Sequence, residues 1–570
     1  MEIKRLIRSI AVLLILNSAC LISYAQPANW LWAGSAAGTG LSAACRANCT
    51  DINGNVLVTG VFYNPSISFG GIVLSNNSIT NNSDIFVVKY DDAGNVLWAK
   101  SEGGIYGEGS LGISTDAYGN VYVTGSFSSP TITFGSTVLT NSGAGDFFLV
   151  KYDSSGNVLW AKQASGTDGE GGYAVCTDAN GNVMVTGSYN SPTLTFGSIV
   201  LTNAGVTGTG DIFITKYDSS GNVLWAKRAG GTYHELAWGI STDANGNIFV
   251  TGSFTSPTLD FGGIILTNTG VGLTSLDVFI AKYDSSGNVL WGKNPIGIDS
   301  DSGMGIATDS DGNALITGFF ESPSLTLGSI VLINSGGNCS TNACPDVFIA
   351  KYDASGNILW AKRAGGNGED QGFSICTDNA GNAYITGLLF SPTITFGSIT
   401  LTPNCPWPQC YPMFIAKYDS AGNALCAVSL DSFGYGKGGV TADNFGNAYI
   451  SDEFNIDPFI VGNYTLTLNG TSNVFTAKFT CGATASNELI GGNDQVQIFP
   501  NPFMNQLKIH SRFVKQKSEL KVYDVFGRTI YSQKSLPENN TLNTAGWQKG
   551  IYFLDVSING ERTVKKILKG

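Results

Sequence analysis

The sequence predicts an all-β chain, a seven-bladed β-propeller with a split-blade closure, followed by a small C-terminal β-sandwich. Three observations predict this fold. A motif of the form Lys-Tyr-Asp-x-x-Gly-Asn, followed by a Trp-containing strand, recurs six times at intervals of 62 to 69 residues. A second motif, Asp-x-x-Gly-Asn, recurs seven times in register with the first. The two ends of the repeated region each supply half of a seventh copy, so we expect the repeats to close into a ring.

The two motifs define the units. The lysines of the first motif are Lys89, Lys151, Lys216, Lys282, Lys351 and Lys417, and the aspartates of the second are Asp51, Asp116, Asp178, Asp243, Asp309, Asp378 and Asp443. The Trp strand missing from the seventh unit is found upstream, where residues 29–34 (NWLWAG) match the NVLWAK pattern. Its partner lies downstream, at residues 473–479 (NVFTAKF). Joining the two ends in one sheet leaves no free edge strand.

Each unit has the pattern of an antiparallel meander. In the unit that begins at Gly112, apolar residues alternate with small or polar ones, and β-branched and aromatic residues dominate, which is typical of strands. The Asp-x-x-Gly-Asn segments supply tight turns. We expect four strands per unit, with an extra hairpin between the second and third. Seven such sheets arranged radially bury each face against a neighbour, and this predicted propeller occupies residues 26–482.

Two repeated side chains have structural interpretations. The Trp of the fourth strand is expected to pack blade against blade, with an aromatic ligand shelf as the alternative; Cys426 takes its place in the sixth unit. The Lys of the first motif occurs in all seven units when Lys478 is counted, and it matches the seven motif aspartates one to one. We expect each Lys-Asp pair to fix strand register, with ligand binding as the alternative.

Composition excludes one class of partner. The chain has 570 residues, a formal net charge of -12 and 73 glycines, many of them in recurrent turn pairs. Nucleic-acid binding needs clustered cations that displace counterions, and the repeats contain no basic stripe. We therefore expect no nucleic-acid partner.

The N-terminus has the order of a secretory signal peptide. Basic residues at Lys4, Arg5 and Arg8 precede an apolar run and a Ser-Tyr-Ala segment. We expect residues 1–25 to be removed by cleavage between Ala25 and Gln26. The segment NSAC around Cys20 is a weaker alternative, a lipoprotein site. No other segment is long and apolar enough to span a membrane.

Export permits disulfide bonds among the ten cysteines that follow the leader. Cys339 with Cys344, and Cys405 with Cys410, occupy matching loops of adjacent units and are expected to close small local rings. Three cysteines that share one register, two residues before the motif Asp, are expected to be buried thiols; they are Cys49, Cys176 and Cys376. The sequence does not decide whether Cys426 and Cys481 pair.

The repeat phrases GNVYVTG and FIAKYDSSGNVLWAK resemble the SBBP-type propeller repeats of bacterial surface proteins. The resemblance covers residues 29–480 and is specific for fold. It carries no catalytic motif that can be transferred to this chain.

The composition changes after Cys481. A Gly/Asn/Ser-rich linker at residues 483–494 is followed by residues 495–570, which read as a small β-sandwich of six to seven strands. This segment resembles the type A C-terminal sorting domain of the type IX secretion system. The matching residues are Pro500, Asn501, Pro502, Gly527, Arg528, Gly550, Tyr552, Lys565 and Lys566. The resemblance implies a Gram-negative bacterium of the Bacteroidota type and interaction with the type IX machinery. It also implies removal of the tail on release or on attachment to surface lipopolysaccharide.

The candidate site is a set of five loop carboxylates. Histidine is too scarce for a Ser-His-Asp relay or a multi-histidine metal site, since the repeats contain only His234. Eight residues before the motif Asp, five units carry an acid: Glu108, Glu170, Glu235, Asp301 and Asp370. Ala43 and Tyr435 fill this register in the units that flank the closure. Tyr106, Tyr233 and Trp238 enrich the same face. The acids are expected at the channel mouth, as a ligand rim or a cation site, or as acceptors of backbone N–H bonds.

These observations lead to one hypothesis and two alternatives. We expect a secreted or cell-surface monomer without catalytic residues or cofactor, other than a cation at the channel mouth, that binds an extracellular glycan or protein. The first alternative is a carbohydrate-active hydrolase or lyase that uses two of the five loop carboxylates. The second is a structural surface-layer component.

Overall fold

The computed structural model describes two compact units, residues 1–480 and 481–570. The described residues are 28–38, 42–79, 81–206, 208–270, 275–336, 344–404, 411–431 and 438–481, then 496–499, 506–511, 518–524, 528–535, 539–548, 550–558 and 561–569. All regular elements in these ranges are β-strands, which confirms the all-β class. In the same ranges no helix is long and apolar enough to cross a membrane. The expected leader with its cleavage site at Ala25 and Gln26, and the linker at 483–494, lie outside the described residues.

The described part of the first unit contains seven antiparallel sheets, each with four main strands. The innermost strands are β3 (Ala43–Thr50), β9 (Glu108–Thr115), β15 (Glu170–Thr177), β21 (Glu235–Thr242), β27 (Asp301–Thr308), β33 (Asp370–Thr377) and β39 (Gly439–Ala442). The second strands are β4 (Val56–Phe62), β10 (Val121–Phe127), β16 (Val183–Tyr189), β22 (Ile248–Phe254), β28 (Ala314–Phe320), β34 (Ala383–Leu389) and β40 (Asn447–Phe454).

The outer half of each sheet is equally regular. The third strands are β7 (Asp84–Tyr90), β13 (Asp146–Tyr152), β19 (Asp211–Tyr217), β25 (Asp277–Tyr283), β31 (Asp346–Tyr352), β37 (Met413–Tyr418) and β43 (Asn473–Cys481). The outermost strands are β8 (Val96–Glu102), β14 (Val158–Ala164), β20 (Val223–Ala229), β26 (Val289–Lys293), β32 (Ile358–Gly365), β38 (Ala424–Leu430) and β1 (Ala28–Ser35). Second and third strands are buried almost throughout, because each lies between two neighbouring sheets.

The predicted extra hairpin is present between the second and third strands. Its strands are β5 (Ser66–Phe69) and β6 (Ile72–Ser75), β11 (Thr131–Phe134) and β12 (Thr137–Thr140), β17 (Thr193–Phe196) and β18 (Ile199–Thr202), β23 (Thr258–Asp260) and β24 (Ile265–Thr267), β29 (Ser324–Leu327) and β30 (Ile330–Ile333), β35 (Ile394–Phe396) and β36 (Ile399–Leu401), and β41 (Phe459–Val461) and β42 (Tyr464–Leu466). One further short strand, β2 (Ala37–Gly38), pairs with β5.

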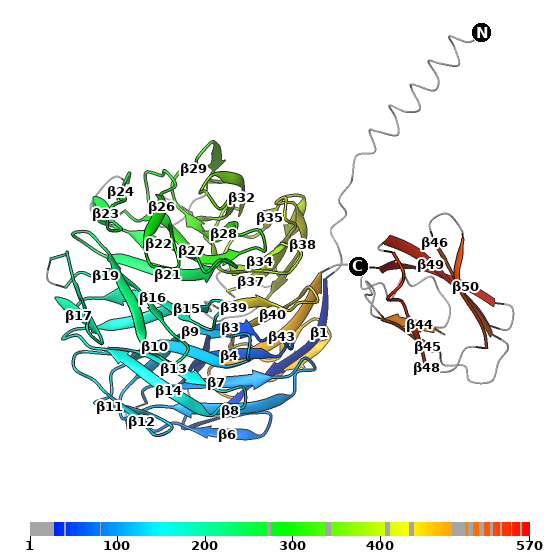
Figure 1. Cartoon of the computed structure of the whole chain (residues 1–570), viewed down its shortest axis with the longest axis horizontal. Helices are drawn as coiled ribbons and strands as arrows, with labels where there is room; N and C mark the ends of the chain where they lie inside the picture. Colours follow the sequence, from blue (N-terminus) through cyan, green and yellow to red (C-terminus); the bar gives the residue numbers. More distant parts are fainter. Residues whose placement is uncertain are drawn as a thin grey trace, which may run out of the picture. The chain divides into compact units, whose positions relative to one another are not determined.

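The seven sheets form a closed ring around a central channel (Figure 1). Each innermost strand contacts the innermost strands of the sheets before and after it, and β39 contacts β3. A chain of hydrogen bonds follows these contacts. The hydroxyl of the Thr that precedes a motif Asp donates to the matching carbonyl of the previous sheet: Thr115 to Thr50, Thr177 to Thr115, Thr242 to Thr177, Thr308 to Thr242 and Thr377 to Thr308. Thr50 extends this chain across the closing junction by donating to the Ala442 carbonyl.

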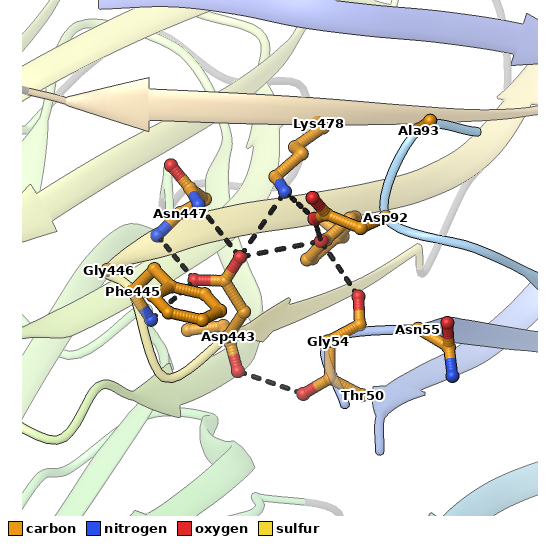
Figure 2. A network of polar contacts seen from close by, with 12 residues as sticks. Thr50, Gly54, Asn55, Asp92, Ala93, Asp443, Phe445, Gly446, Asn447 and Lys478 are labelled. Carbon is orange, nitrogen blue, oxygen red and sulfur yellow. Dashed lines mark hydrogen bonds and ion pairs between the residues drawn. The ribbon is translucent and has the colours of Figure 1, made fainter. Parts of the chain in front are cut away.

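The predicted split closure is confirmed by the strand order β1-β43-β40-β39 in one sheet. Figure 2 shows the junction of this sheet with the first one. Lys478 contacts both Asp443, at 3.4 Å, and Asp92. The Tyr449 hydroxyl donates to the Gly54 carbonyl at 3.0 Å and to Asp92 at 2.9 Å. At the position of Asp92 five of the other units carry Ser or Ala and the seventh carries Cys481, so this acid is specific to the closing junction.

The predicted Lys-Asp pairs are present in all seven sheets. The Lys Nζ to Asp Oδ2 distances are 2.9 Å (Lys89–Asp51), 3.9 Å (Lys151–Asp116), 3.0 Å (Lys216–Asp178), 3.6 Å (Lys282–Asp243), 2.8 Å (Lys351–Asp309), 3.4 Å (Lys417–Asp378) and 3.4 Å (Lys478–Asp443). Both partners are buried. Each Asp also closes its own turn; Asp178, for example, accepts the backbone N–H groups of Asn180 and Asn182. The pair therefore links the turn between the first two strands to the third strand.

The Trp of the outermost strand joins neighbouring sheets, as predicted. Its indole N–H donates to a backbone carbonyl in the turn of the next unit: Trp32 to Asp92, Trp98 to Ser154, Trp160 to Ser219, Trp225 to Ser285, Trp291 to Ala354 and Trp360 to Ser420. The ring also covers the turn glycine, such as Gly156, whose φ is +81°. The alternative of a ligand shelf has no support from these contacts.

Four of the described cysteines are free, and of these Cys45 is buried while the three predicted buried thiols are partly buried. Cys49, Cys176 and Cys376 are free thiols, and burial raises the pKa of each above its usual range. Cys344, Cys426 and Cys481 take part in disulfide bonds. Cys339, Cys405 and Cys410 lie outside the described residues.

The second unit is a small sandwich of two sheets. One contains β44 (Val496–Phe499), β45 (Gln506–Ser511) and β48 (Asn539–Asn543), and the other contains β46 (Ser518–Asp524), β47 (Thr529–Lys534), β49 (Gly550–Ile558) and β50 (Glu561–Lys569). Buried Leu507, Val522 and Leu554 belong to its core.

The described sorting-motif residues have structural contacts. The Arg528 guanidinium donates to Asp524 at 2.6 Å, and the Tyr552 hydroxyl donates to the Gln548 carbonyl at 2.7 Å. Gly550 begins β49, and Lys565 and Lys566 lie in β50. Pro500, Asn501, Pro502 and Gly527 lie outside the described residues.

The buried Lys-Asp pair yields the first prediction. Asp178→Ala leaves the Lys216 ammonium buried without its counterion, so we expect a loss of roughly 3–5 kcal/mol in the free energy of unfolding. Asp218→Ala is the matched control, because Asp218 makes the same turn bonds without a lysine partner. This control should cost about 1 kcal/mol. Urea denaturation followed by Trp fluorescence measures both, and equal losses would contradict the role of the pair.

The closing junction yields the second prediction. Asp92→Ser makes this junction like the others, and we expect hydrogen exchange in β1 and β43 to accelerate with a loss of about 1 kcal/mol, since the Asp92 side chain is 62% exposed. Ser219→Ala, at the same position of an internal junction, should leave exchange in the neighbouring strands unchanged. Unaltered exchange in β1 and β43 of the Asp92 variant would refute the proposed role.

Candidate functional site

The five loop carboxylates do not form an exposed rim. Each is the first residue of an innermost strand, and the exposed fractions are 2% for Glu108, 3% for Glu170, 0% for Glu235, 1% for Asp301 and 0% for Asp370. The prediction of an exposed rim at the channel mouth is therefore wrong, because neighbouring loops cover these side chains. Ala43 takes this position in β3, and Tyr435 lies outside the described residues.

The carboxylates instead hold loops together. Asp370 accepts the backbone N–H groups of Phe390 and Ser391, each at 3.1 Å, the Ser391 hydroxyl at 2.6 Å and the Gly366 N–H at 2.9 Å. The matching serine contacts each of the other acids: Ser129 with Glu108, Ser191 with Glu170, Ser256 with Glu235 and Ser322 with Asp301. This arrangement is the alternative stated from the sequence, in which the acids accept backbone N–H bonds.

A second buried acid lies beside each loop carboxylate. It is the first residue of the third strand of the preceding sheet: Asp84, Asp146, Asp211, Asp277 and Asp346, all fully buried. Arg228 pairs with Asp211 at 2.9 Å, and Arg363 with Asp346 at 2.7 Å. In the described part of the chain, no group of three or more His, Cys, Asp or Glu residues is placed to hold a metal ion.

Burial and the charge of the neighbouring acid both raise the pKa values of four of the loop carboxylates. Burial, with the neighbouring Asp146 carboxylate as a smaller cause, raises the pKa of Glu170 to about 8. Burial likewise raises the pKa of Glu235 to about 8 and those of Asp301 and Asp370 to about 7. Two acids this close and this buried cannot both ionise without cost, which favours the protonated form of Glu170 and Glu235 near neutral pH.

The structure reveals a different candidate site inside the channel. Six innermost strands, β3, β9, β15, β21, β27 and β33, contain a β-bulge at the same place, where the pairing with the second strand shifts by one residue. A bulge leaves one residue outside the ladder and turns it away from the sheet. The extra residues line the channel and are half-buried; they are Arg46, Leu111, Tyr173, Trp238, Met304 and Phe373, here called the channel ring. Gly438 takes this register in the seventh sheet.

The channel ring lines a cavity of about 530 Å³. Tyr173 and Trp238 stack with ring centroids 5.1 Å apart and an interplanar angle of 20°. The Tyr173 hydroxyl bonds the Ser188 hydroxyl at 2.7 Å, which fixes the ring. Trp238, Met304 and Phe373 come from consecutive sheets, so they continue this arc of apolar side chains around the channel. A cavity of this size, lined by apolar side chains together with polar groups, is typical of small-molecule and side-chain binding sites.

Sequence reasoning named only Trp238 among the ring residues. The signal was present in the repeats: five residues before the motif Asp is the only inner-strand position at which no residue type recurs among the seven units. The acids eight residues before the Asp are easier to recognise as a candidate site, because they recur from unit to unit within the chain. A bulge turns this varied position toward the channel. No single residue type in the repeats predicts that bulge.

The comparisons with known proteins identify the C-terminal unit. Residues 497–570 match the model of the secretion system C-terminal sorting domain, which confirms the predicted sorting tail. A chain with this domain is secreted or displayed at the cell surface of a Gram-negative bacterium.

Two relatives match part of the chain at low identity. The chain is 26% identical over 400 residues to an uncharacterized WD repeat-containing protein of Acanthamoeba polyphaga mimivirus, covering 59% of this chain and 28% of that one. It is 24% identical over 275 residues to the regulatory protein FlaEY of Caulobacter vibrioides, covering 46% and 28%. The chain thus spans less than a third of the length of either relative.

Solved structures add only weak similarities. The WD40 domain of Neurospora crassa Pan2 is 10% identical, with a TM-score of 0.31 over 66% of this chain and 89% of that one. PorZ, a surface component of the type IX secretion system of Porphyromonas gingivalis, is 11% identical, with a TM-score of 0.16 over 94% of this chain and 100% of that one. These values carry no information on function.

The paired acids yield a pH prediction. Because their pKa values are raised in the folded state, folding takes up protons, and the associated stability is present below about pH 4 and lost as the pH rises through 7 to 8. We expect the melting temperature to fall between pH 6 and pH 9. Glu170→Gln supplies a permanent amide hydrogen beside Asp146, so the fall should be smaller in this variant. Asp311→Asn, which removes an exposed carboxylate, is the control; identical pH profiles for both variants would contradict the assignment.

Proposed function

We propose that this protein is a non-enzymatic propeller, secreted or held at the cell surface, that binds an extracellular glycan or protein ligand in its channel. The observation that carries the proposal is the channel ring. The repeats preserve their turns, Lys-Asp pairs and Trp contacts from unit to unit, whereas the channel position carries a different side chain in each unit. Variation confined to cavity-lining positions on a rigid scaffold is typical of a binding surface.

The location of the carboxylates argues against a hydrolase or lyase. Glycoside cleavage by two carboxylates requires both to face the substrate. The five loop carboxylates are buried in loop contacts, and no acid of the described residues lines the channel cavity. A structural surface-layer component is the second alternative, and it predicts self-association of the purified protein.

The sorting tail supports the route of export. We propose that the type IX machinery recognises residues 497–570 and that removal of this tail accompanies release or attachment to surface lipopolysaccharide. The mature propeller is then a monomer in contact with the medium. The SBBP-type resemblance of the repeats is consistent with this placement.

A binding screen tests the proposal. We would probe a glycan and extracellular-matrix array with the full chain, the variant Trp238→Ala and the control Tyr118→Ala, which removes an aromatic that is 80% exposed and outside the cavity. Loss of a buried aromatic anchor costs about 2 kcal/mol or more in binding, so signals should fall at least about thirtyfold for Trp238→Ala and persist for the control. Equal signals from all three proteins, release of cleaved glycan, or concentration-dependent self-association without ligand would contradict it.

A further inference from the structure

Arg46 is an unusual member of the channel ring. It is the only charged residue among the described residues that line the cavity. Among the described residues its guanidinium has no direct hydrogen bond or salt bridge, although the buried Asp452 carboxyl of β40 interacts with it electrostatically from further away. The other basic side chains buried in this unit are paired; each motif lysine, for example, contacts its aspartate. An Arg presents five N–H donors in a planar fork that suits a carboxylate, so a half-buried Arg without a directly bonded counterion has its donors available for an anionic group.

Of the polar side-chain atoms of the cavity, the buried Asn48 Oδ1 has no hydrogen-bond partner in the described part of the chain. Apart from Arg46, the other polar side-chain groups are bonded within the protein. The Asn48 amide donates to the Gly439 carbonyl at 2.9 Å and to the Tyr449 carbonyl at 3.2 Å. The Ser374 hydroxyl accepts the Val440 N–H at 3.1 Å. The Tyr173 hydroxyl is bonded to Ser188. A neutral sugar would therefore find few free side-chain partners for its hydroxyl groups in this cavity, and each hydroxyl buried without a partner weakens binding.

The rest of the lining suits an apolar body. Leu111, Met304 and Phe373 offer aliphatic, thioether and aromatic surface, and the Tyr173–Trp238 stack offers a rigid aromatic wall. Met adapts to irregular shapes, and aromatic walls bury large areas at a small cost in side-chain entropy. The units flanking Arg46 in the ring carry Gly438 and Leu111, so no neighbouring ring residue supplies a negative charge to neutralise it.

We propose that the channel binds a ligand made of an apolar body that carries one carboxylate, with the carboxylate on Arg46 and the body against the apolar arc of Tyr173, Trp238, Met304 and Phe373. This inference rests on the proposed function, since it names the chemistry of the same site. Two sources share that chemistry: a small aromatic or aliphatic carboxylic acid, and the free C-terminus of a peptide that ends in apolar residues.

Isothermal titration calorimetry with the full chain tests the proposal. The small-molecule probes are 4-phenylbutyrate and its neutral amide, 4-phenylbutyramide. The peptide probes are Ala-Ala-Leu-Phe with a free C-terminus and with an amidated one. We expect each acid to bind about tenfold to a hundredfold more tightly than its amide, because a hydrogen bond to a charged group is worth that ratio. The tighter of the two acids identifies the source.

Three variants distinguish the contribution of the Arg46 charge from that of the apolar wall. Arg46→Gln should abolish the preference for acid over amide while keeping the amide affinity, and Trp238→Ala should weaken both. Lys293→Gln, which removes an exposed cation from the outermost strand β26, should change neither. Melting curves of each variant show that it is folded.

The outcomes distinguish the inference from the function on which it rests. Equal binding of acid and amide, or an acid preference that survives Arg46→Gln, would overturn the inference and leave channel binding in place. A folded chain that binds none of the four probes would overturn the inference, while the array experiment with Trp238→Ala decides the proposed function separately. An acid preference that Arg46→Gln removes supports both.

Discussion

The fold depends on one repeated interaction, the buried ion pair between the Lys of the third strand and the Asp of the first turn. The lysine is buried to within a few per cent of its surface, so it needs a counterion, and the Asp that provides it is fixed by two backbone N–H groups of its own turn. The same lysine contacts a carbonyl of the next sheet, as Lys151 does with Ser219 at 3.0 Å. A single pair thus sets the turn, the register of the third strand and the position of the neighbouring sheet.

This constraint separates the positions that repeat from those that vary. A residue that serves the Lys-Asp pair or its turn has the same partner in every unit, so its identity is retained. The channel ring has no such partner because a bulge turns it away from the sheet. The closing junction is the other exception, since Asp92 adds an acid where internal junctions carry Ser or Ala. The channel ring and the Asp92 junction both depart from the repeat. We infer that the side chains at each have a role that the repeated positions do not have.

The fold could be predicted from the sequence because each structural signal is local and recurs in successive units. The Gly-Asn turns, the alternating strands and the two half-units at residues 29–34 and 473–479 each predict the same closed arrangement. The exposure of the loop carboxylates could not be predicted, for a physical reason. Glu235 and Asp370 lie at the start of strands whether they are exposed or buried, and their burial depends on how loops from two sheets pack over them. The bulge that exposes Arg46 and Trp238 to the channel is a feature of how the first and second strands pair, and no residue type marks it in the sequence.

The most direct test of ligand binding in the channel observes one ring residue. Met304 is the only methionine of the channel ring, whereas Met184 and Met413 are buried in the sheets. We would label the methionine ε-methyl groups with ¹³C, assign Met304 with the variant Met304→Leu, and titrate the full chain with 4-phenylbutyrate in the NMR spectrometer. Binding in the channel predicts a saturable shift of the Met304 methyl resonance while those of Met184 and Met413 stay in place. An unshifted Met304 resonance during a titration that calorimetry records as binding would contradict the assignment of the site.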